Sequence, residues 1–436
     1  MVDFAKYNAT THPIVKLDDD WNNAVDHAFE KPYQFTLRKK STLWEAIYGD
    51  AADQAGKVYD RNADMVTLLN DVMVNGLTAG RTAKEHVLVK GVGDVNSSIL
   101  LPDYCSLDVR GGLKITTAAI SLFDSPDVVT ADSEEVDINI TDIDCNNLQV
   151  DLFTKVFFKL TFKNAIFRNC SPTQGITVFA NGGIDVRIED LYFDKPKNVN
   201  FGQVDYSVIQ RCKVIGDGTQ TIGGSIIDYS SGYNKFLHNE IRGFTYDAMR
   251  SFNCSHSLCE GNVFEMLNPT GGADGLWGNF SDTIVRNNWF IEVASEQIEN
   301  GSGTNCLIEG NRIWNSAASK KFILSTSSIL RNNYGVNPYG KITNPFYNTS
   351  PYGIGLKGTA ATPTASRTYN IQNLDCIISS TNSGNADNAI QIKDPAGNNV
   401  NPTTLSTLDG YFLPIRYQIN WGAFTGAAPT VVACGV

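Results

Sequence analysis

Three acidic residues recur in the middle of the chain and are the best candidates for chemistry. Each is followed two residues later by an apolar residue, and they are Asp247, Asp274 and Glu296. If the repeats stack, these carboxylates lie about 5 Å apart and repel each other, so one keeps its proton near neutral pH. A protonated and an ionised carboxyl together can hydrolyse a glycosidic bond. We expect the central Asp274 to be the acid; alternatively, the three are turn residues repeated by the period.

Aromatic residues accompany the acidic ones on the same repeats. The candidates for a glycan-binding surface are Tyr246, Trp277, Trp289 and Trp314. A flat ring that faces solvent binds sugar rings through apolar contact, whereas a ring that faces inward serves the core. In the predicted stack Trp289 lies between Val263 and Arg312, which favours an outward position. We therefore expect a long acidic or neutral glycan to run beside Trp277 and Trp289.

Metal and covalent chemistry have little support in the sequence. The five histidines are dispersed and the nine cysteines form no CxxC pair, so neither a metal site nor a cofactor is predicted. The oxygen atoms of the acidic column are a weaker alternative, as ligands for Ca²⁺. Most cysteines lie in apolar strand patterns, which is typical of buried thiols made in a reducing compartment.

An internal repeat supplies the elements that position these residues. Segments of the form apolar-apolar-x-x-Asn-x-apolar recur about every 24 residues, which fits one turn of a parallel β-helix built from short strands. Asn tolerates the left-handed backbone of a tight bend, and stacked Asn amides can bond along the column. The predicted Asn slots hold Asp142, Asn164, Asp190, Cys212, Asn239, Asn262, Asn288, Asn311 and Asn333.

Charges next to the Asn slots support the same register. Two residues before four of these slots the charge alternates in sign, at Glu260, Arg286, Glu309 and Arg331. Opposite charges on stacked neighbours stabilise strand pairing. We interpret this row as structural.

Five regions follow along the chain. Residues 1–60 carry little pattern and are interpreted as an attachment or adaptor region, while 61–104 hold a helix over 62–76 and the first strands. The β-helix is predicted over 105–335, a Pro- and Gly-rich linker over 336–366, and a small β-sandwich or barrel over 367–436. The helix is expected to cover the open end of the β-helix. The predicted fold class is all-β: a right-handed parallel β-helix with an N-terminal capping helix and a small C-terminal β domain.

Charge and hydropathy limit the partners. Lys and Arg number 35 against 46 Asp and Glu, a net charge of −11, which argues against binding to nucleic acid or anionic lipid. The longest apolar stretches fall far short of the roughly 18–20 residues that a membrane span needs, so no membrane insertion is predicted.

The helix, the runs 98–102 and 107–112, and the Asn-punctuated repeats together resemble the pectin-lyase-like superfamily of parallel β-helices over residues 62–335. Within it, the layout is most similar to viral tailspikes. This resemblance implies a homotrimer on the virion tail, assembled in the host cytoplasm, that contacts other tail proteins through its N-terminal region. It also implies binding of a cell-surface polysaccharide. Polygalacturonase-like members use Asp residues on neighbouring turns, so the resemblance permits cleavage as well.

Three functions remain open at this point. A tailspike would bind, and in some cases depolymerise, a host polysaccharide. A free-standing, secreted polysaccharide lyase or glycoside hydrolase would be a monomer with sharp activity on one polymer. A non-catalytic structural or adhesive β-helix would tolerate changes to the acidic column.

Overall fold

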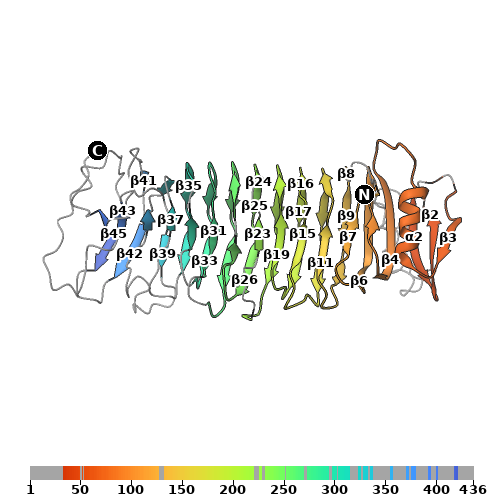
Figure 1. Ribbon diagram of the computed structural model, residues 1–436, viewed down its shortest axis with the longest axis horizontal. Helices are drawn as coiled ribbons and strands as arrows, with labels where there is room; N and C mark the ends of the chain where they lie inside the picture. Colours follow the sequence, from red (N-terminus) through yellow and green to blue (C-terminus); the bar gives the residue numbers. More distant parts are fainter. Residues whose placement is uncertain are drawn as a thin grey trace, which may run out of the picture.

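The computed structural model describes residues 33–49, 52, 54–126, 132–219, 225–227, 231–250, 252–269, 273–293, 297–301 and 303–314, and short strands between 323 and 420. The strands stack side by side along one long axis, with the N-terminal strands at one end and the C-terminal strands at the other (Figure 1). Successive turns pair in parallel. The predicted all-β, parallel β-helix is confirmed.

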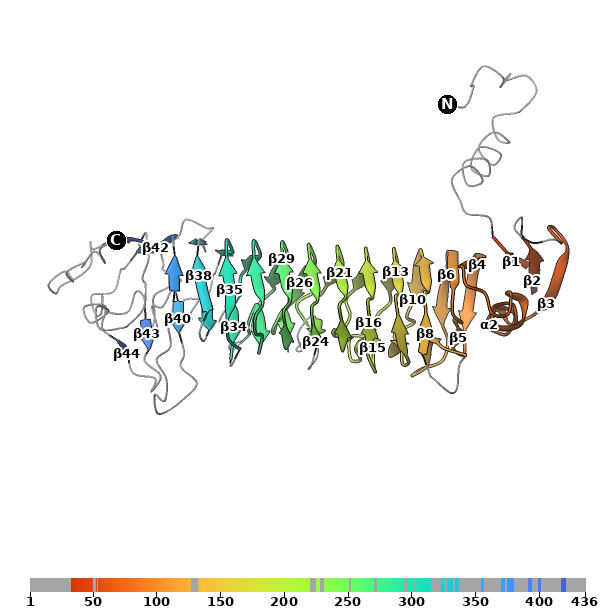
Figure 2. The same cartoon turned by 90° about the horizontal axis from the view of Figure 1, so that it is seen from above.

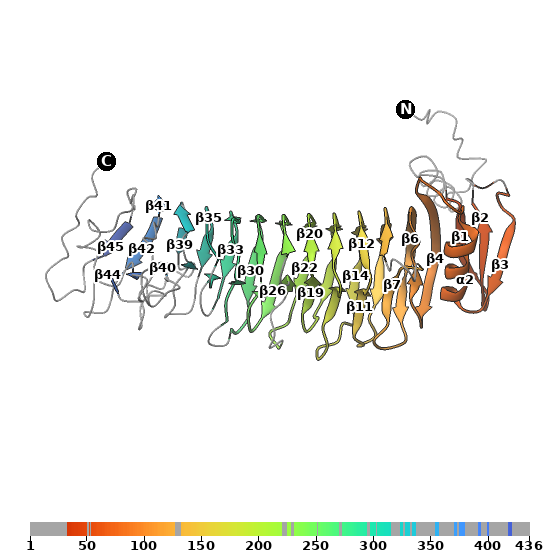
Figure 3. The same cartoon turned by 45° about the horizontal axis from the view of Figure 1, so that its top comes forward.

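Each turn, or rung, contributes strands to three faces, of which the first two belong to a 26-stranded sheet and the third is a 13-stranded sheet. Seen from above, the large sheet and the third face lie along opposite sides of the solenoid (Figure 2). The first face contains β9 (Asp137–Ile140), β13 (Thr161–Lys163), β17 (Arg187–Glu189), β21 (Val208–Gln210), β25 (Lys235–Leu237), β29 (Leu258–Glu260), β32 (Ile284–Arg286), β35 (Cys306–Glu309) and β38 (Ser328–Arg331). The second face, visible in Figure 3, contains β10 (Asp142–Asp144), β14 (Ile166–Arg168), β18 (Tyr192–Asp194), β22 (Lys213–Ile215), β26 (Glu240–Phe244), β30 (Val263–Met266), β33 (Trp289–Ile291), β36 (Arg312–Trp314) and β39 (Tyr334–Val336).

The third face is the sheet that carries the candidate functional site. Its strands are β5 (Ile99–Leu100), β7 (Ser121–Asp124), β11 (Val150–Phe153), β15 (Ile176–Phe179), β19 (Val199–Gly202), β23 (Ser225–Ile227), β27 (Met249–Arg250), β31 (Leu276–Gly278), β34 (Ile298–Asn300), β37 (Ile323–Ser325), β40 (Ile354–Leu356), β43 (Gln391–Lys393) and β44 (Asn399–Val400). Short strands edge the corner that leads back to the first face: β8 (Asp132–Glu134), β12 (Val156–Phe158), β16 (Gly183–Ile184), β20 (Val204–Asp205), β24 (Ser231–Gly232) and β28 (Cys254–Ser255). Alternating side chains point inward to a continuous apolar core, in which Phe123, Phe153 and Phe179 stack rung upon rung.

A column of buried amides closes the corner between the first and second faces, as the sequence predicts. Its members are Asn239, Asn262, Asn288 and Asn311. The Oδ1 of each of the last three accepts the backbone N–H of the Asn one rung earlier, at 2.8–3.0 Å. Their Nδ2 groups donate to main-chain carbonyls of the rung before, such as that of Cys259. Asn333 lies outside the described residues.

The register predicted for the earlier rungs is wrong by one residue. Strand pairing aligns Asn239 with Cys212, and then continues through Leu191, Ala165 and Thr141. Asn164 and Asp190 occupy the preceding left-handed position, with φ of 68° and 57°, and Asp142 begins the next strand. The left-handed bend and the amide slot are therefore two adjacent columns, and in three of the earlier rungs the slot holds a buried apolar residue, Ala165, Leu191 or Cys212.

Asn288→Leu should lower the free energy of unfolding by about 3 kcal/mol, because it leaves several buried hydrogen-bonding groups unpaired. Asn288 accepts the backbone N–H of Asn262 and donates to the carbonyl of Cys259 and to Asn311. The matched control is Asn287→Gly, because Asn287 lies in the left-handed column that Gly261 and Gly310 also fill. Denaturant melts should place this control within about 0.5 kcal/mol of wild type. Equal stability of the two variants would contradict the amide column.

The N-terminal end is more ordered than its sequence pattern indicates. Strands β1 (Phe35–Lys40), β2 (Leu43–Tyr48) and β3 (Val58–Asn62) form an antiparallel unit, and β1 pairs in parallel with β4 (Glu85–Val95). The stack thus begins at β4, which pairs along its whole length with β6 (Cys105–Ile115), rather than at residue 105. Residues 1–32 of the predicted attachment region lie outside the described residues.

The predicted helix is present as α2 (Met65–Asp71), followed by a π-helical turn, η2 (Val72–Gly76). Asp64 caps it by accepting the N–H of Thr67 at 2.8 Å. Its apolar side buries Met65, Leu68 and Leu69 in the core at the end of the solenoid. No helix in the described part of the chain is long and apolar enough to cross a membrane.

The described strands near the C-terminus continue the solenoid. β41 (Asn370–Gln372) and β42 (Asp375–Ser379) pair in parallel with β38 and β39, and β45 (Tyr417–Asn420) pairs with β42. The separate sandwich or barrel over 367–436 stays a prediction. The rest of that region and most of the predicted linker lie outside the described residues.

Candidate functional site

Two of the three predicted acidic residues stack on neighbouring rungs, at the corner between the second and third faces. Asp247 and Asp274 precede β27 and β31, and they are only 4% and 5% exposed. The backbone N–H of Asp274 donates to Asp247 Oδ1 at 2.8 Å, and the N–H of Ala248 donates to the carbonyl of Asp274 at 3.0 Å. Glu296 lies outside the described residues. The predicted register of Asp247 and Asp274 is therefore present, with Asp247 bonded to the next rung.

Asp247 has the unusual acidity that the sequence assigned to Asp274. The pKa of Asp247 is raised from 3.8 to about 6, mainly by burial and to a smaller extent by the negative charge of Glu299. The hydrogen bond from Asp274 and the positive charge of Arg250 lower that pKa and partly offset the effect of burial. The Oδ2 of Asp247 lies 3.7 Å from Nε of Arg250. Asp247 thus carries a proton over part of the range near neutral pH.

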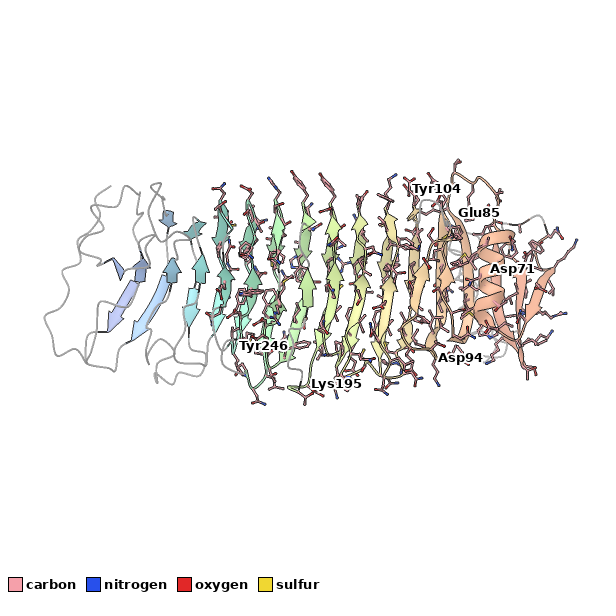
Figure 4. All side chains as sticks on the ribbon, in the orientation of Figure 1. Asp71, Glu85, Asp94, Tyr104, Lys195 and Tyr246 are labelled. Atoms are coloured by element: carbon pink, nitrogen blue, oxygen red, sulfur yellow. The ribbon has the colours of Figure 1, made fainter. Side chains whose placement is uncertain are left out.

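Arg250 is held between two aromatic rings beside this carboxyl. Its guanidinium carbon lies 5.6 Å from the ring centroid of Tyr246 and 5.9 Å from that of Trp277. The side chain is 42% exposed. Within the described residues, the guanidinium makes no hydrogen bond to the protein, and its nearest carboxylate is that of Asp247. Its N–H groups are therefore held at the surface beside Tyr246, which Figure 4 labels, and they can donate hydrogen bonds to a ligand.

Many other charged side chains on the solenoid pair with a charged neighbour on an adjacent rung. Arg286 bonds Glu260 at 2.9 Å on the first face, which confirms the predicted pairing, and Lys213 lies 3.2 Å from Glu240 on the second. Arg168 likewise pairs with Asp142. Such pairs cover the first two faces with solvated, balanced charge. Arg250 on the third face differs from these three residues, because it lies between two aromatic rings and its contact with Asp247 is longer, at 3.7 Å.

Arg250, Trp277 and Glu299 form one outward row across three successive strands. Met249 pairs with Leu276, and Trp277 pairs with Glu299. Arg250 and Glu299 are not among the residues predicted from the sequence, although a signal for them is present. Arg250 follows Met249 and Glu299 follows Ile298, the apolar residues by which the acidic column is aligned. Because side chains on a strand alternate between faces, the residue after an inward apolar residue points outward.

The predicted aromatic residues do not share one surface. Tyr246 and Trp277 lie at the acidic corner and the third face, but Trp289 is on β33 of the second face, between Val263 and Arg312 as predicted. There the guanidinium carbon of Arg312 lies 5.1 Å from the Trp289 ring centroid. A ligand along the third face would contact Trp277 and not Trp289, which corrects the expected path. The side chain of Trp314 lies outside the described residues.

The acidic corner does not form a metal centre in the described part of the chain. No group of three or more His, Cys, Asp or Glu residues there is arranged to hold a metal ion. One oxygen of Asp247 is already engaged by the next rung. The corner combines a protonatable carboxyl, a guanidinium with free N–H donors and an aromatic ring. Groups of these three kinds can donate a proton, bind an anionic substituent and pack on a sugar ring.

Comparisons with known proteins concern the fold alone. No protein-family profile and no curated protein matches the sequence. Among solved structures, the surface protein and adhesin PfbA of Streptococcus pneumoniae is similar with a TM-score of 0.49 and 11% identity, covering 80% of this chain and 91% of that chain. The A-module of the mannuronan C-5 epimerase AlgE6 of Azotobacter vinelandii gives 0.47 and 11%, covering 71% and 90%. A tailspike protein mutant of E. coli bacteriophage HK620, in complex with hexasaccharide, gives 0.44 and 12%, covering 82% and 71%. All three are similar to this chain as β-helices.

Proposed function

We propose that the chain binds a cell-surface polysaccharide along its third face, and that the polysaccharide is acidic. The observation that carries this proposal is Arg250, whose guanidinium lies between Tyr246 and Trp277 and donates no hydrogen bond to the described part of the chain. A planar guanidinium recognises carboxylate or phosphate oxygens through two parallel hydrogen bonds. Holding it in place beforehand reduces the entropy lost on binding.

The neighbouring residues suit a sugar polymer. Trp277 follows Arg250 in the outward row, and its partly exposed indole can pack on the apolar side of a sugar ring. Because the protein carries a net charge of −11, it repels an acidic polymer on average, and a local cation favours binding at its own position. The position of Arg250 would therefore set the register of the polymer on the rungs.

A second function, cleavage of the bound polymer, is favoured by the raised pKa of Asp247, about 6. In this proposal the proton on Oδ2 moves to the glycosidic oxygen, and the bond from that oxygen to the anomeric carbon breaks. A water that gives its proton to Glu299 attacks the carbon. Asp274 supports the acid by its N–H bond to Oδ1. Asp274 and Glu296 remain the alternative carboxyl pair.

The layout suggests where such a protein acts. We propose a tailspike-like, receptor-binding role on a virion, with the N-terminal region contacting other tail proteins. The compact β1–β3 unit and α2 at one end of the solenoid support this arrangement. A free-standing secreted enzyme and a purely adhesive β-helix are the alternatives.

Binding and cleavage can be separated by experiment. Polysaccharides that differ only in the reduction of their carboxylates to alcohols should be compared by surface-immobilised binding. The acidic form should bind, and the reduced form should bind at least tenfold more weakly. Release of new reducing ends then reports cleavage. Binding without release identifies an adhesin, whereas equal binding of the two polymers refutes the role of Arg250.

The proposed virion role predicts a homotrimer. Light scattering after size exclusion should give about three times the monomer mass of 47.7 kDa. Deleting residues 367–436 should leave monomers or aggregates, because the C-terminal region is proposed to drive association. A monomeric full-length protein would favour the free-standing enzyme, and a trimer that survives the deletion would place the contacts elsewhere.

A further inference from the structure

A stack of exposed rings lies at the corner between the third and first faces, which we call the ring corner. Tyr206 and Tyr233 are parallel within 2° with centroids 4.8 Å apart, and Tyr233 stacks on His256 at 4.8 Å. Asp282 follows, 3.9 Å from His256. The same column includes Tyr104, which Figure 4 labels on the edge opposite Tyr246. The ring corner is therefore separate from the acidic corner.

The position of these rings costs stability. Tyr206 and Tyr233 are 60% and 50% exposed, and both have left-handed backbones with φ of 53° and 57°. A bulky residue in that region is a conformational outlier, which Asn or Gly would avoid. Contacts between the stacked rings offset only part of this cost. Two solvent-exposed tyrosines at such positions point to a use other than packing.

Tyr206 is the open end of the stack. One of its ring faces covers Tyr233, and the other is turned toward the rung before, where Asp185 holds the same position. An Asp side chain is shorter than a Tyr side chain and cannot cover the ring. The result is a step whose floor is the outer part of the Tyr206 ring and whose wall is the carboxylate of Asp185.

The carboxylate of Asp185 has no ion-pair partner among the described residues. The nearest lysine along the column, Lys159, is taken by Glu134 at 2.9 Å and Glu135 at 3.2 Å. Asp185 is exposed, and its backbone N–H bonds the carbonyl of Asp205. An aromatic face beside an unpaired carboxylate attracts a positive group through both a cation–π contact and an ion pair.

We propose that this step binds the free ammonium group of an amino sugar, as a second glycan site distinct from the third face. The site is one residue wide, which suits a single sugar unit and not the large apolar area of a protein partner. Beyond it, the polar tips of Tyr233, His256 and Asp282 follow at the strand spacing of about 4.8 Å and can bond sugar hydroxyls.

The test uses the full-length chain and the tetramer of glucosamine, with the N-acetylated tetramer as an uncharged probe. Saturation-transfer NMR and titration should show binding of the glucosamine tetramer only. Asp185→Asn and Tyr206→Asn should each weaken it by about three- to tenfold. Asn tolerates the left-handed backbone, so both variants should be at least as stable as wild type in denaturant melts. Asp60→Asn removes one exposed negative charge from β3, away from the ring corner; it is the matched control and should change affinity less than twofold.

Several results would overturn this proposal. If neither substitution lowers the affinity, binding reflects general attraction of a cation to a negatively charged protein. If the two tetramers bind equally, the site does not recognise the ammonium group. A tetralysine peptide that depends more strongly on Tyr206 and Asp185 than the sugar does would assign the step to a protein partner. Arg250→Met should leave binding of the glucosamine tetramer unchanged, so failure at the third face and failure here can be told apart.

Discussion

Asp247→Asn is expected to lower cleavage of the bound polysaccharide by about 10²- to 10⁴-fold, while binding persists. The amide keeps an oxygen to accept the N–H of Asp274, so the corner should retain its shape. What it loses is the proton on Oδ2 that the glycosidic oxygen needs. The measurement is reducing-end release from an acidic host polysaccharide, with binding of the same polymer measured in parallel.

The pH dependence gives this prediction a second readout. Because the acid must be protonated, wild-type cleavage should fall as the pH rises through about 6, the pKa of Asp247. The residual activity of Asp247→Asn should lack this limb. A variant that keeps the limb would show that another group supplies the proton.

At neutral pH the Asp247→Asn substitution should raise stability while it lowers activity. A carboxyl whose pKa is raised on folding, here from 3.8 to about 6, stabilises the native state below the lower value and loses that contribution as the pH rises through the higher one. The loss is at most about 3 kcal/mol. Asp247→Asn should therefore be more stable than wild type at pH 7.5 and show no such gain at pH 3.5. Denaturant melts at the two pH values test the sign.

Asp274→Asn is the informative comparison, because the sequence alone favours Asp274 as the acid. Asp274 meets Asp247 through its backbone N–H, which the substitution leaves in place. We expect a smaller loss of cleavage than for Asp247→Asn and an unchanged pH limb. The reverse order of the two variants would return the acid role to Asp274.

The repeat could be predicted because one residue type served one purpose on each rung. Asn239, Asn262, Asn288 and Asn311 share a single role, the burial of an amide between two rungs. The earlier rungs could not be aligned in this way, since Asn164 and Asp190 satisfy a backbone bend one residue away. Asn and Asp suit both positions, and the sequence does not distinguish a left-handed φ from a buried amide.

The site was harder to predict because its properties arise from burial and from strand pairing. The acidic column was visible, but the desolvation that singles out Asp247 depends on side chains from several rungs. Trp277 and Trp289 are 12 residues apart, about half a turn, which is enough to place them on different faces. Arg250 is distinguished by the hydrogen bonds that it does not make to the residues that the structure describes, and no residue pattern reports those.

Arg250→Met should weaken binding of the acidic polysaccharide by about 10- to 100-fold, the value of one or two hydrogen bonds to a charged group. Met keeps an apolar stem between Tyr246 and Trp277, so the loss reports the guanidinium. Arg250→Lys should recover only part of the affinity, because an ammonium cannot form two parallel bonds to a carboxylate. Binding of the carboxyl-reduced polymer should be the same in all three proteins.

Arg312→Met is the matched control for this change, since Arg312 also lies over a tryptophan, Trp289, but on the second face. It removes one positive charge and one cation–π contact, and it should alter affinity less than twofold. Arg250→Met should also shift the pH limb of residual cleavage upward, because the positive charge of Arg250 lowers the pKa of Asp247. An acidic ligand that neutralises Arg250 has the same effect in the wild-type protein, so binding of the correct polymer would itself help to keep the proton on the acid. Equal losses of affinity in the Arg250 and Arg312 variants would show that the polymer follows the overall charge of the protein and that the third face has no special role.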